Sequence, residues 1–249
     1  MINETKPIFV VGSPRSGTTL MRAILDSHPQ IFCPSWETGL FVHLAPMLNG
    51  DLIKVLKNEG AGFPLRRADL VDWVRRCALD LFEQFGQKAG KPRWAEKTPA
   101  HVHYIEFICE VFPGARFLHM IRNGYDVVKS LNNMPWAPRR IRWSVNTWVR
   151  SVQAGRAAAA TLPSGQYFEV RYERLIQEPR PVLDEVCSFL GEPFVPQMLE
   201  FHEPEKNSWK TQHKPIQNRP VNQYRELNPW ERLAFSWLGG RLMRELGYG

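Results

Sequence analysis

Apolar and polar residues alternate along the chain in blocks, and the clearest block is the apolar run Ile8–Val11, which leads into a glycine-flanked turn. A short apolar run bounded by turn residues is typical of a strand that is buried on both faces. The residues after the turn have helical periodicity until His28-Pro29 ends the helix. The same order of strand and helix occurs three times, at residues 8–12 and 18–27, 116–121 and 124–132, and 166–170 and 179–190.

The rest of the pattern completes an α/β arrangement. Shorter apolar segments predict further strands at 31–33 and 93–96, and helices are predicted at about 39–58, 68–89, 100–112, 142–161 and 229–246. Strands that alternate with helices favour a central parallel sheet with helices on both faces. We expect residues 1–249 to form a single domain. Its polar, proline-containing segment 202–228 is predicted to be a long loop before the last helix.

Composition adds the kind of ligand and the cellular setting. The chain has 249 residues, 43% of them hydrophobic, and a net charge of +7, which fits a globular protein that favours anionic ligands. The four cysteines show no C-x-x-C spacing, so neither zinc nor a disulfide framework is expected. The short polar start and the lack of a membrane-length apolar run predict a cytoplasmic protein without a membrane span.

The turn after the first strand carries the first chemical motif, Gly12-Ser13-Pro14-Arg15-Ser16-Gly17-Thr18-Thr19. Its spacing is that of a phosphate-binding P-loop, in which backbone amides and a helix N-terminus converge on one anion. Thr18 occupies the position of the lysine that ATP- and GTP-binding loops use, and Arg15 is the only cation in the loop. The loop therefore predicts a phosphate-bearing donor that lacks a γ-phosphate.

The second motif runs from Arg122 to Ser130 and follows the strand at 116–121. Arg122 lies at the strand end and Ser130 about two turns into the next helix, so both could hold one phosphate from two sides. The alternative is that Arg122 caps the helix or pairs with Asp126.

These two motifs, in this order, resemble those of the sulfotransferases that use 3′-phosphoadenosine 5′-phosphosulfate (PAPS). Three further segments are similar to segments of that family: Phe112–Phe117, Glu169–Leu175 and Phe189–Gly191. The resemblance covers about residues 7–195 and is closest to the tyrosylprotein sulfotransferases and related bacterial enzymes. It implies the sulfotransferase fold, with PAPS as donor, 3′-phosphoadenosine 5′-phosphate (PAP) as product and no metal.

The resemblance also implies which residues hold the donor. The first motif would bind the 5′-phosphosulfate, Arg122 and Ser130 the 3′-phosphate, and Tyr172 would stack on or hydrogen-bond to the nucleotide. In the tail, Arg219-Pro220-Val221-Asn222 resembles a stretch near the family's C-terminal nucleotide loop, and Ser208 and Arg219 could close over the 3′-phosphate. A solvated loop is the alternative there. The implied donor contacts are Arg15, Ser16, Gly17, Thr18, Thr19, Arg122, Ser130, Tyr172, Ser208 and Arg219.

The candidate reacting groups are Glu37, Lys97 and His101, together with Arg15. Glu37 resembles the catalytic glutamate of the tyrosylprotein enzymes, although Trp36 and Gly39 differ from the family pattern. Lys97 resembles the lysine that reaches the leaving-group oxygen, with a surface pair to Glu96 as the alternative. His101 is the other candidate base, because histidine is the most common proton acceptor near neutral pH.

The predicted function is transfer of a sulfonate group from PAPS to a hydroxyl by in-line displacement with a general base. The acceptor could be a small molecule, a carbohydrate, a lipid or a peptide tyrosine. No nucleic-acid partner is expected, and a homodimer is compatible with the family. A nucleotide kinase with a degenerate P-loop and a non-catalytic nucleotide-binding protein are the alternatives.

Overall fold

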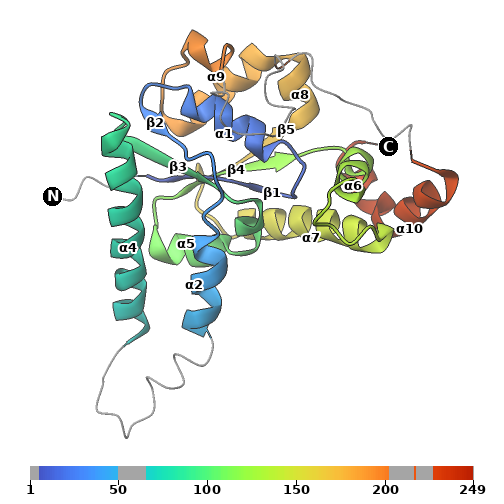
Figure 1. Cartoon of the computed structure of the whole chain (residues 1–249), viewed down its shortest axis with the longest axis horizontal. Coiled ribbons are helices and arrows are strands. Elements are labelled where there is room, and N and C mark those ends of the chain that lie inside the picture. The colour runs from blue at the N-terminus through green and yellow to red at the C-terminus, as the bar shows by residue number, and fades with distance from the viewer. Residues whose placement is uncertain (1–5, 50–65, 202–215, 217–226, 249) are drawn as a thin grey trace, which may run out of the picture.

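The computed structural model describes residues 6–49, 66–201, 216 and 227–248. Its centre is a five-stranded sheet in the order β2-β3-β1-β4-β5, with every neighbouring pair parallel (Figure 1). The strands are β1 (Ile8–Gly12), β2 (Ile31–Phe32), β3 (Arg93–Lys97), β4 (Arg116–Ile121) and β5 (Tyr167–Arg171). The α/β class with a parallel sheet, predicted from the alternation of strands and helices, is confirmed.

Helices cover both faces of this sheet (Figure 1). One face carries α1 (Thr18–Asp26), α8 (Tyr172–Gln177) and α9 (Pro179–Leu190). The other face carries α2 (Leu40–Asn49), α4 (Arg67–Lys88), α5 (Ile105–Val111) and α7 (Ile141–Ala159). Beside α7 lie α6 (Gly124–Asn132) and α10 (Pro229–Glu245), which pack on one another and on α7.

The central strand β1 explains why its sequence is apolar without alternation. Ile8 and Val10 are buried in the core under α1 and α9, whereas Phe9 and Val11 are buried in the core on the opposite face. All five residues of β1 are buried. Because every strand of a parallel sheet ends at the same edge, the segments that follow β1, β3, β4 and β5 meet there.

Several predicted boundaries differ from the structure. The predicted helix 100–112 is divided into a 3₁₀ helix, η1 (Pro99–His103), and α5, because Tyr104 leaves helical geometry between them. The short helix α8 was not predicted at all, since it follows β5 directly. The predicted helix 39–58 is present as α2 up to Asn49, and its remainder lies outside the described residues. Most of the predicted loop 202–228 also lies outside them.

Candidate active site

The loop after β1 is held in an unusual backbone conformation. Arg15 has a φ of 71° and Gly17 a φ of 102°, and a residue other than glycine is uncommon in that left-handed region. The Ser16 amide and hydroxyl both donate to the Ser13 carbonyl oxygen, at 3.2 and 2.7 Å. Gly17 is the N-cap of α1 and brings no side-chain oxygen to the first-turn amides. These amides have no acceptor within the helix, so an anion is their natural partner.

Arg15 links this loop to the second motif. Its Nε donates to Ser130 Oγ at 2.9 Å, and its carbonyl oxygen accepts from Arg122 Nη1 at 3.2 Å. The structure therefore brings the P-loop, the end of β4 and helix α6 together. Ser130 contacts the Arg15 side chain here.

Three groups orient the buried side chain of Arg122. Besides the Arg15 carbonyl, they are Asp126, whose Oδ2 lies 3.4 Å from Nη2, and the Tyr172 ring, whose centroid lies 4.3 Å from Cζ. The Arg122–Asp126 pair, considered as an alternative to phosphate binding, is thus present within the same arrangement. Tyr172 also packs on the P-loop, since a Cβ on Gly17 would lie 2.5 Å from its ring.

The electrostatics of this corner favour an anion. Burial lowers the pKa of Arg15 first, and the positive charge of Arg122 lowers it further, although the Arg15 side chain still reaches solvent. Within the described residues, the Arg15 side chain donates its hydrogen bond to a neutral group, the Ser130 hydroxyl. Two neighbouring guanidinium groups beside a helix N-terminus are stabilised when a phosphate or sulfonate lies between them. The donor set therefore fits the phosphate and sulfonate groups of a nucleotide ligand.

A second group of site residues lies at the end of β3. Lys97 closes this strand, and its Nζ donates to Glu37 Oε1 at 2.6 Å. The Lys97 side chain is 4% exposed and that of Glu37 50% exposed. The alternative prediction of a surface pair between Lys97 and Glu96 is wrong. Both of these side chains are buried, and successive strand residues point to opposite faces.

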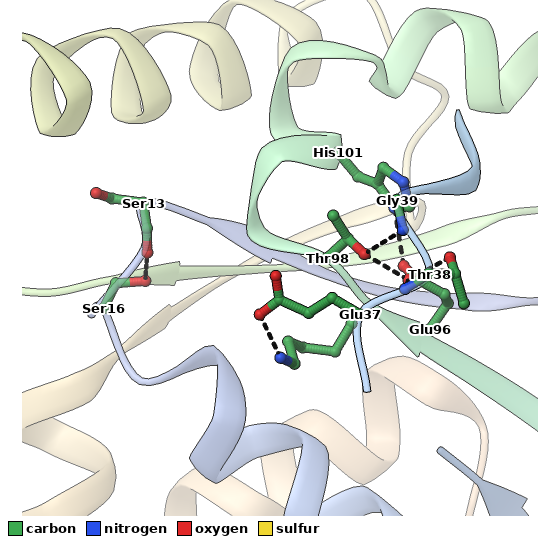
Figure 2. A network of polar contacts seen from close by, with 9 residues as sticks. Ser13, Ser16, Glu37, Thr38, Gly39, Glu96, Thr98 and His101 are labelled. Carbon is green, nitrogen blue, oxygen red and sulfur yellow. Dashed lines mark hydrogen bonds and ion pairs between the residues drawn. The ribbon is translucent and has the colours of Figure 1, made fainter. Parts of the chain in front are cut away.

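The Glu96 carboxylate fastens the loop of Glu37 to β3 (Figure 2). Glu96 Oε1 accepts from the Thr38 amide at 3.3 Å, from the Thr38 hydroxyl at 2.8 Å and from the Thr98 hydroxyl at 2.6 Å. Thr98 Oγ1 in turn accepts from the Gly39 amide at 3.2 Å. The two residues that follow Glu37 are therefore tied to the strand end that carries its ionic partner.

His101 lies behind this network. Its side chain is fully buried, with Nδ1 2.8 Å from Glu96 Oε2, an ion-pair distance without the alignment of a hydrogen bond. Its ring packs edge-on against Phe9 and Phe41. Burial alone would raise the pKa of Glu96, but the contact with His101 and the threonine hydrogen bonds outweigh it, so the pKa of Glu96 lies below its usual value. The structure thus separates the two candidate bases: Glu37 is half-exposed and His101 is enclosed.

Sequence reasoning missed the part played by Glu96 and Thr38. One signal was available: adjacent Glu and Lys residues on a strand must face opposite sides, so Glu96 could not share the environment of Lys97. The other predicted donor contacts in the described residues belong to the P-loop. Ser16 and Thr18 are buried, and Gly17 and Thr19 are partly exposed. Ser208 and Arg219 lie outside the described residues.

Neither a metal-ligand cluster nor a membrane-spanning helix is found in the part of the chain that the structure describes. There, no three histidine, cysteine, aspartate or glutamate side chains are grouped as metal ligands would be. In the same residues, no helix combines the length and the apolar character needed to cross a bilayer.

Comparison with known proteins gives the family from the sequence and the same fold from solved structures. The model of the sulfotransferase family matches residues 7–196. A Caenorhabditis briggsae protein that carries the name of a protein-tyrosine sulfotransferase is 31% identical over 211 residues, which are 81% of this chain and 71% of that protein. The chain spans 41%, 29% and 53% of the length of three other relatives.

Solved structures share the fold. The sulfotransferase domain of the Synechococcus PCC 7002 olefin synthase has a TM-score of 0.65 at 22% identity, and the match covers 93% of both chains. A mouse sulfotransferase in complex with PAP has a TM-score of 0.57 at 14% identity, covering 96% of this chain and 84% of that one.

Proposed function

This chain belongs to the sulfotransferase family, and from that premise we propose that it moves a sulfonate group from PAPS to a hydroxyl acceptor, with Lys97 and Glu37 as its reacting side chains. The observation that carries the proposal is the grouping of Arg15, Arg122 and Tyr172 around the P-loop. It combines a helix N-terminus, two cations and an aromatic ring at one sheet edge, and the helix N-terminus and the cations suit the phosphate groups of a nucleotide.

The residues divide into two parts of the donor site. Arg15 and the amides of residues 16–19 hold the sulfonate and the 5′-phosphate, because a cation and backbone N–H donors meet at the P-loop. Arg122 and Ser130 hold the 3′-phosphate, with Tyr172 against the nucleotide. PAPS supplies the activated sulfonate and, as leaving group, the 5′-phosphate of PAP.

Lys97 and Glu37 act on two different oxygens of the reaction, the leaving-group oxygen and the acceptor oxygen. Glu37 takes the proton of the acceptor hydroxyl as the acceptor oxygen bonds to sulfur and the bond from sulfur to the bridging phosphate oxygen breaks. The Lys97 ammonium stabilises the negative charge that develops on that bridging oxygen, as a compact point charge can. The step needs no oxidant and no further reactant. The acceptor loses its proton to Glu37 and gains the sulfonate, and PAP leaves with the electron pair of the broken bond between sulfur and oxygen.

The contacts of the two candidate bases support Glu37 as the proton acceptor. Its carboxylate is half-exposed beside Lys97, so an acceptor hydroxyl can reach it. His101 is fully buried, and its Nδ1 faces Glu96. A proton acceptor must come within hydrogen-bond distance of the reacting hydroxyl, directly or through one water, and an enclosed imidazole does not meet this condition without rearrangement.

The acceptor is proposed only as a hydroxyl compound. Peptide tyrosine has a direct precedent in the name of the Caenorhabditis briggsae relative, and small-molecule, carbohydrate and lipid hydroxyls remain alternatives. The cytoplasmic location and the homodimer stay predictions, as does the single domain over residues 1–249.

Calorimetric titration with PAP, and with ATP as the comparison, tests the donor site. We expect micromolar or tighter binding of PAP and binding of ATP that is weaker by at least tenfold, since the P-loop has Thr18 in place of the lysine that pairs with β- and γ-phosphates. Transfer of radiolabelled sulfonate from PAPS to a panel of tyrosyl peptides and other hydroxyl compounds would then identify the acceptor. Binding of ATP without binding of PAP would contradict the proposal and favour a nucleotide kinase.

A further inference from the structure

The peptide unit between Arg122 and Asn123 is held from both sides by side chains of other elements. Its carbonyl oxygen accepts from Trp148 Nε1 at 3.1 Å, and its amide donates to Glu173 Oε1 at 2.8 Å. Trp148 belongs to α7 and Glu173 to α8. This peptide connects the end of β4 to α6, so its orientation sets the direction in which the Arg122 side chain leaves the strand.

The same glutamate has a second partner near the end of the chain. The Tyr248 hydroxyl donates to Glu173 Oε2 at 2.7 Å. Burial raises the pKa of Tyr248, as does the nearby Glu173 charge, so this hydroxyl remains a donor at neutral pH. Arg171 completes the attachment: its Nη1 donates to the Leu246 carbonyl at 2.7 Å, and its Cζ lies 5.0 Å from the centre of the Tyr248 ring.

Three consecutive residues therefore connect the nucleotide elements with the segment after α10. Arg171 holds residues 246–248, Tyr172 contacts Arg122 and the P-loop, and Glu173 bridges Asn123 and Tyr248. Each oxygen of Glu173 has one donor. An ionised carboxylate that accepts two hydrogen bonds of 2.7 and 2.8 Å is restrained in position and orientation.

We propose that Glu173 and Tyr248 are positioning residues for donor binding: the Tyr248 hydroxyl orients the Glu173 carboxylate, which fixes the Arg122–Asn123 peptide and thereby aims Arg122 at the nucleotide. The inference rests on the proposed function, in which Arg122 binds the donor. It assigns a role to a residue outside the family match, which ends at residue 196. Neither Glu173 nor Tyr248 touches the reacting atoms in this scheme, so their effect falls on donor affinity rather than on the chemical step.

The test compares Tyr248→Phe and Glu173→Gln with the wild-type full chain. Tyr248→Phe removes one hydroxyl and keeps the ring against Arg171. We expect PAP to bind on the order of tenfold more weakly to each variant, the size expected for losing one hydrogen bond to a charged group. The KM for PAPS should rise in parallel, with kcat at saturating donor within about twofold of wild type. The double variant should bind PAP no more weakly than the weaker single variant, because both act through one contact.

Glu185→Gln is the matched control. It removes an exposed carboxylate that pairs with Arg174 at 2.6 Å on the same face of the sheet, without a contact to Arg122 or Asn123, and PAP affinity should not change. The inference is overturned if Tyr248→Phe and Glu173→Gln lower the melting temperature but bind PAP as wild type does, because the contact is then only stabilising. It is also overturned if kcat falls while PAP affinity is unchanged. A wild-type chain that fails to bind PAP would instead contradict the proposed function itself.

Discussion

The ammonium of Lys97 and the carboxylate of Glu37 lie 2.6 Å apart, although 60 positions separate the two residues in the sequence. Lys97 is almost fully buried and Glu37 is half-exposed, so the pair forms part of the wall of the site with the carboxylate on the open side. On this geometry rests our proposal that the buried cation serves the leaving group and the accessible carboxylate serves the acceptor. It makes the two roles separable by substitution.

Glu37→Gln tests the role of general base. Glutamine keeps the size and one oxygen of the side chain but cannot accept the hydroxyl proton, so we expect turnover to fall by about a hundredfold or more, the usual contribution of a general base. PAP affinity should remain within about threefold of wild type, since Glu37 is not a proposed phosphate contact. Glu178→Gln, at an exposed carboxylate between α8 and α9, is the control. Unchanged turnover in Glu37→Gln would exclude Glu37 as the base.

Lys97→Met tests stabilisation of the leaving group. Methionine has a similar length and no charge, so the variant should lose about a hundredfold or more in kcat, the scale for removing one group that stabilises transition-state charge. The melting temperature should hold or rise, because a buried charge is replaced by an apolar side chain of similar volume and the Glu37 carboxylate that loses its partner is half-exposed to water. Parallel measurement of kcat and thermal unfolding separates the two effects. A loss of stability that accounts for the whole loss of activity would argue against the catalytic role.

The sequence predicted most of the fold because its strongest signals are local. The apolar run of β1 and the periodic helices after β1 and β4 are visible without tertiary information, and all are present within a residue or two. The division between η1 and α5 was missed because Tyr104 breaks the helix through its backbone conformation, with no proline or glycine to mark the break. The extra helix α8 was missed because it is only six residues long and follows β5 without an intervening turn.

The sequence predicted the motif residues of the site but not the contacts that position them. The motifs predicted that Arg15, Arg122 and Ser130 lie at one edge of the sheet, because parallel strands end at the same edge. Contacts such as Glu96 with Thr38, or Glu173 with Tyr248, join residues 58 and 75 positions apart. Neither their spacing nor their residue types distinguish them from surface polar groups, so only the tertiary structure reveals them.

Glu96→Gln tests the attachment of the Glu37 loop. The amide cannot carry the charge that strengthens the hydrogen bonds from Thr38 and Thr98, so we expect the free energy of unfolding at pH 7 to fall by about 1–3 kcal/mol. Because the pKa of Glu96 is lowered in the fold, its stabilising effect is present above its usual value and is lost as the pH falls through the lowered value. Turnover should fall more than PAP affinity, since the loop carries Glu37 and no phosphate contact. Urea unfolding at two pH values measures the loss of stability, and a turnover assay beside PAP titration measures the two effects on activity.

Gly17→Ala tests the packing of Tyr172 on the P-loop. Gly17 has a φ of 102°, and an added Cβ would lie 2.5 Å from the tyrosine ring. We expect PAP binding to weaken by at least about tenfold, because ring and loop must move apart at the nucleotide site. Gly165→Ala is a close control: its φ is 82°, yet nothing lies within 4 Å of its added Cβ. That variant should cost about 1–2 kcal/mol in backbone strain and leave PAP affinity unchanged. Equal PAP binding by both variants would contradict the packing argument.

The buried side chain of His119 predicts how stability depends on pH. Burial lowers the pKa of His119 to about 4, and the positive charges of Arg156 and His103 act in the same direction, against the Glu169 carboxylate. Its Nδ1 contacts the Tyr167 hydroxyl, and its ring fills the space where a Cβ on Gly155 would lie. The fold therefore stabilises the neutral form of the His119 imidazole over the protonated form.

Between the ordinary value of 6.5 and about 4, the unfolded chain binds a proton at His119 that the folded chain does not. The free energy of unfolding must therefore decrease as the pH falls through this window, by up to about 3 kcal/mol from this one group. His119→Gln should be less stable than wild type at pH 7 because the packing and the contact with Tyr167 change, but it should lose less stability on acidification. Urea unfolding at pH 7, 6, 5 and 4.5 would show the difference between the two proteins narrowing, with His43→Gln, at an exposed position, as the control. A difference that stays constant across these pH values would mean that His119 takes up its proton equally in the folded and unfolded chains, and that burial does not hold it neutral.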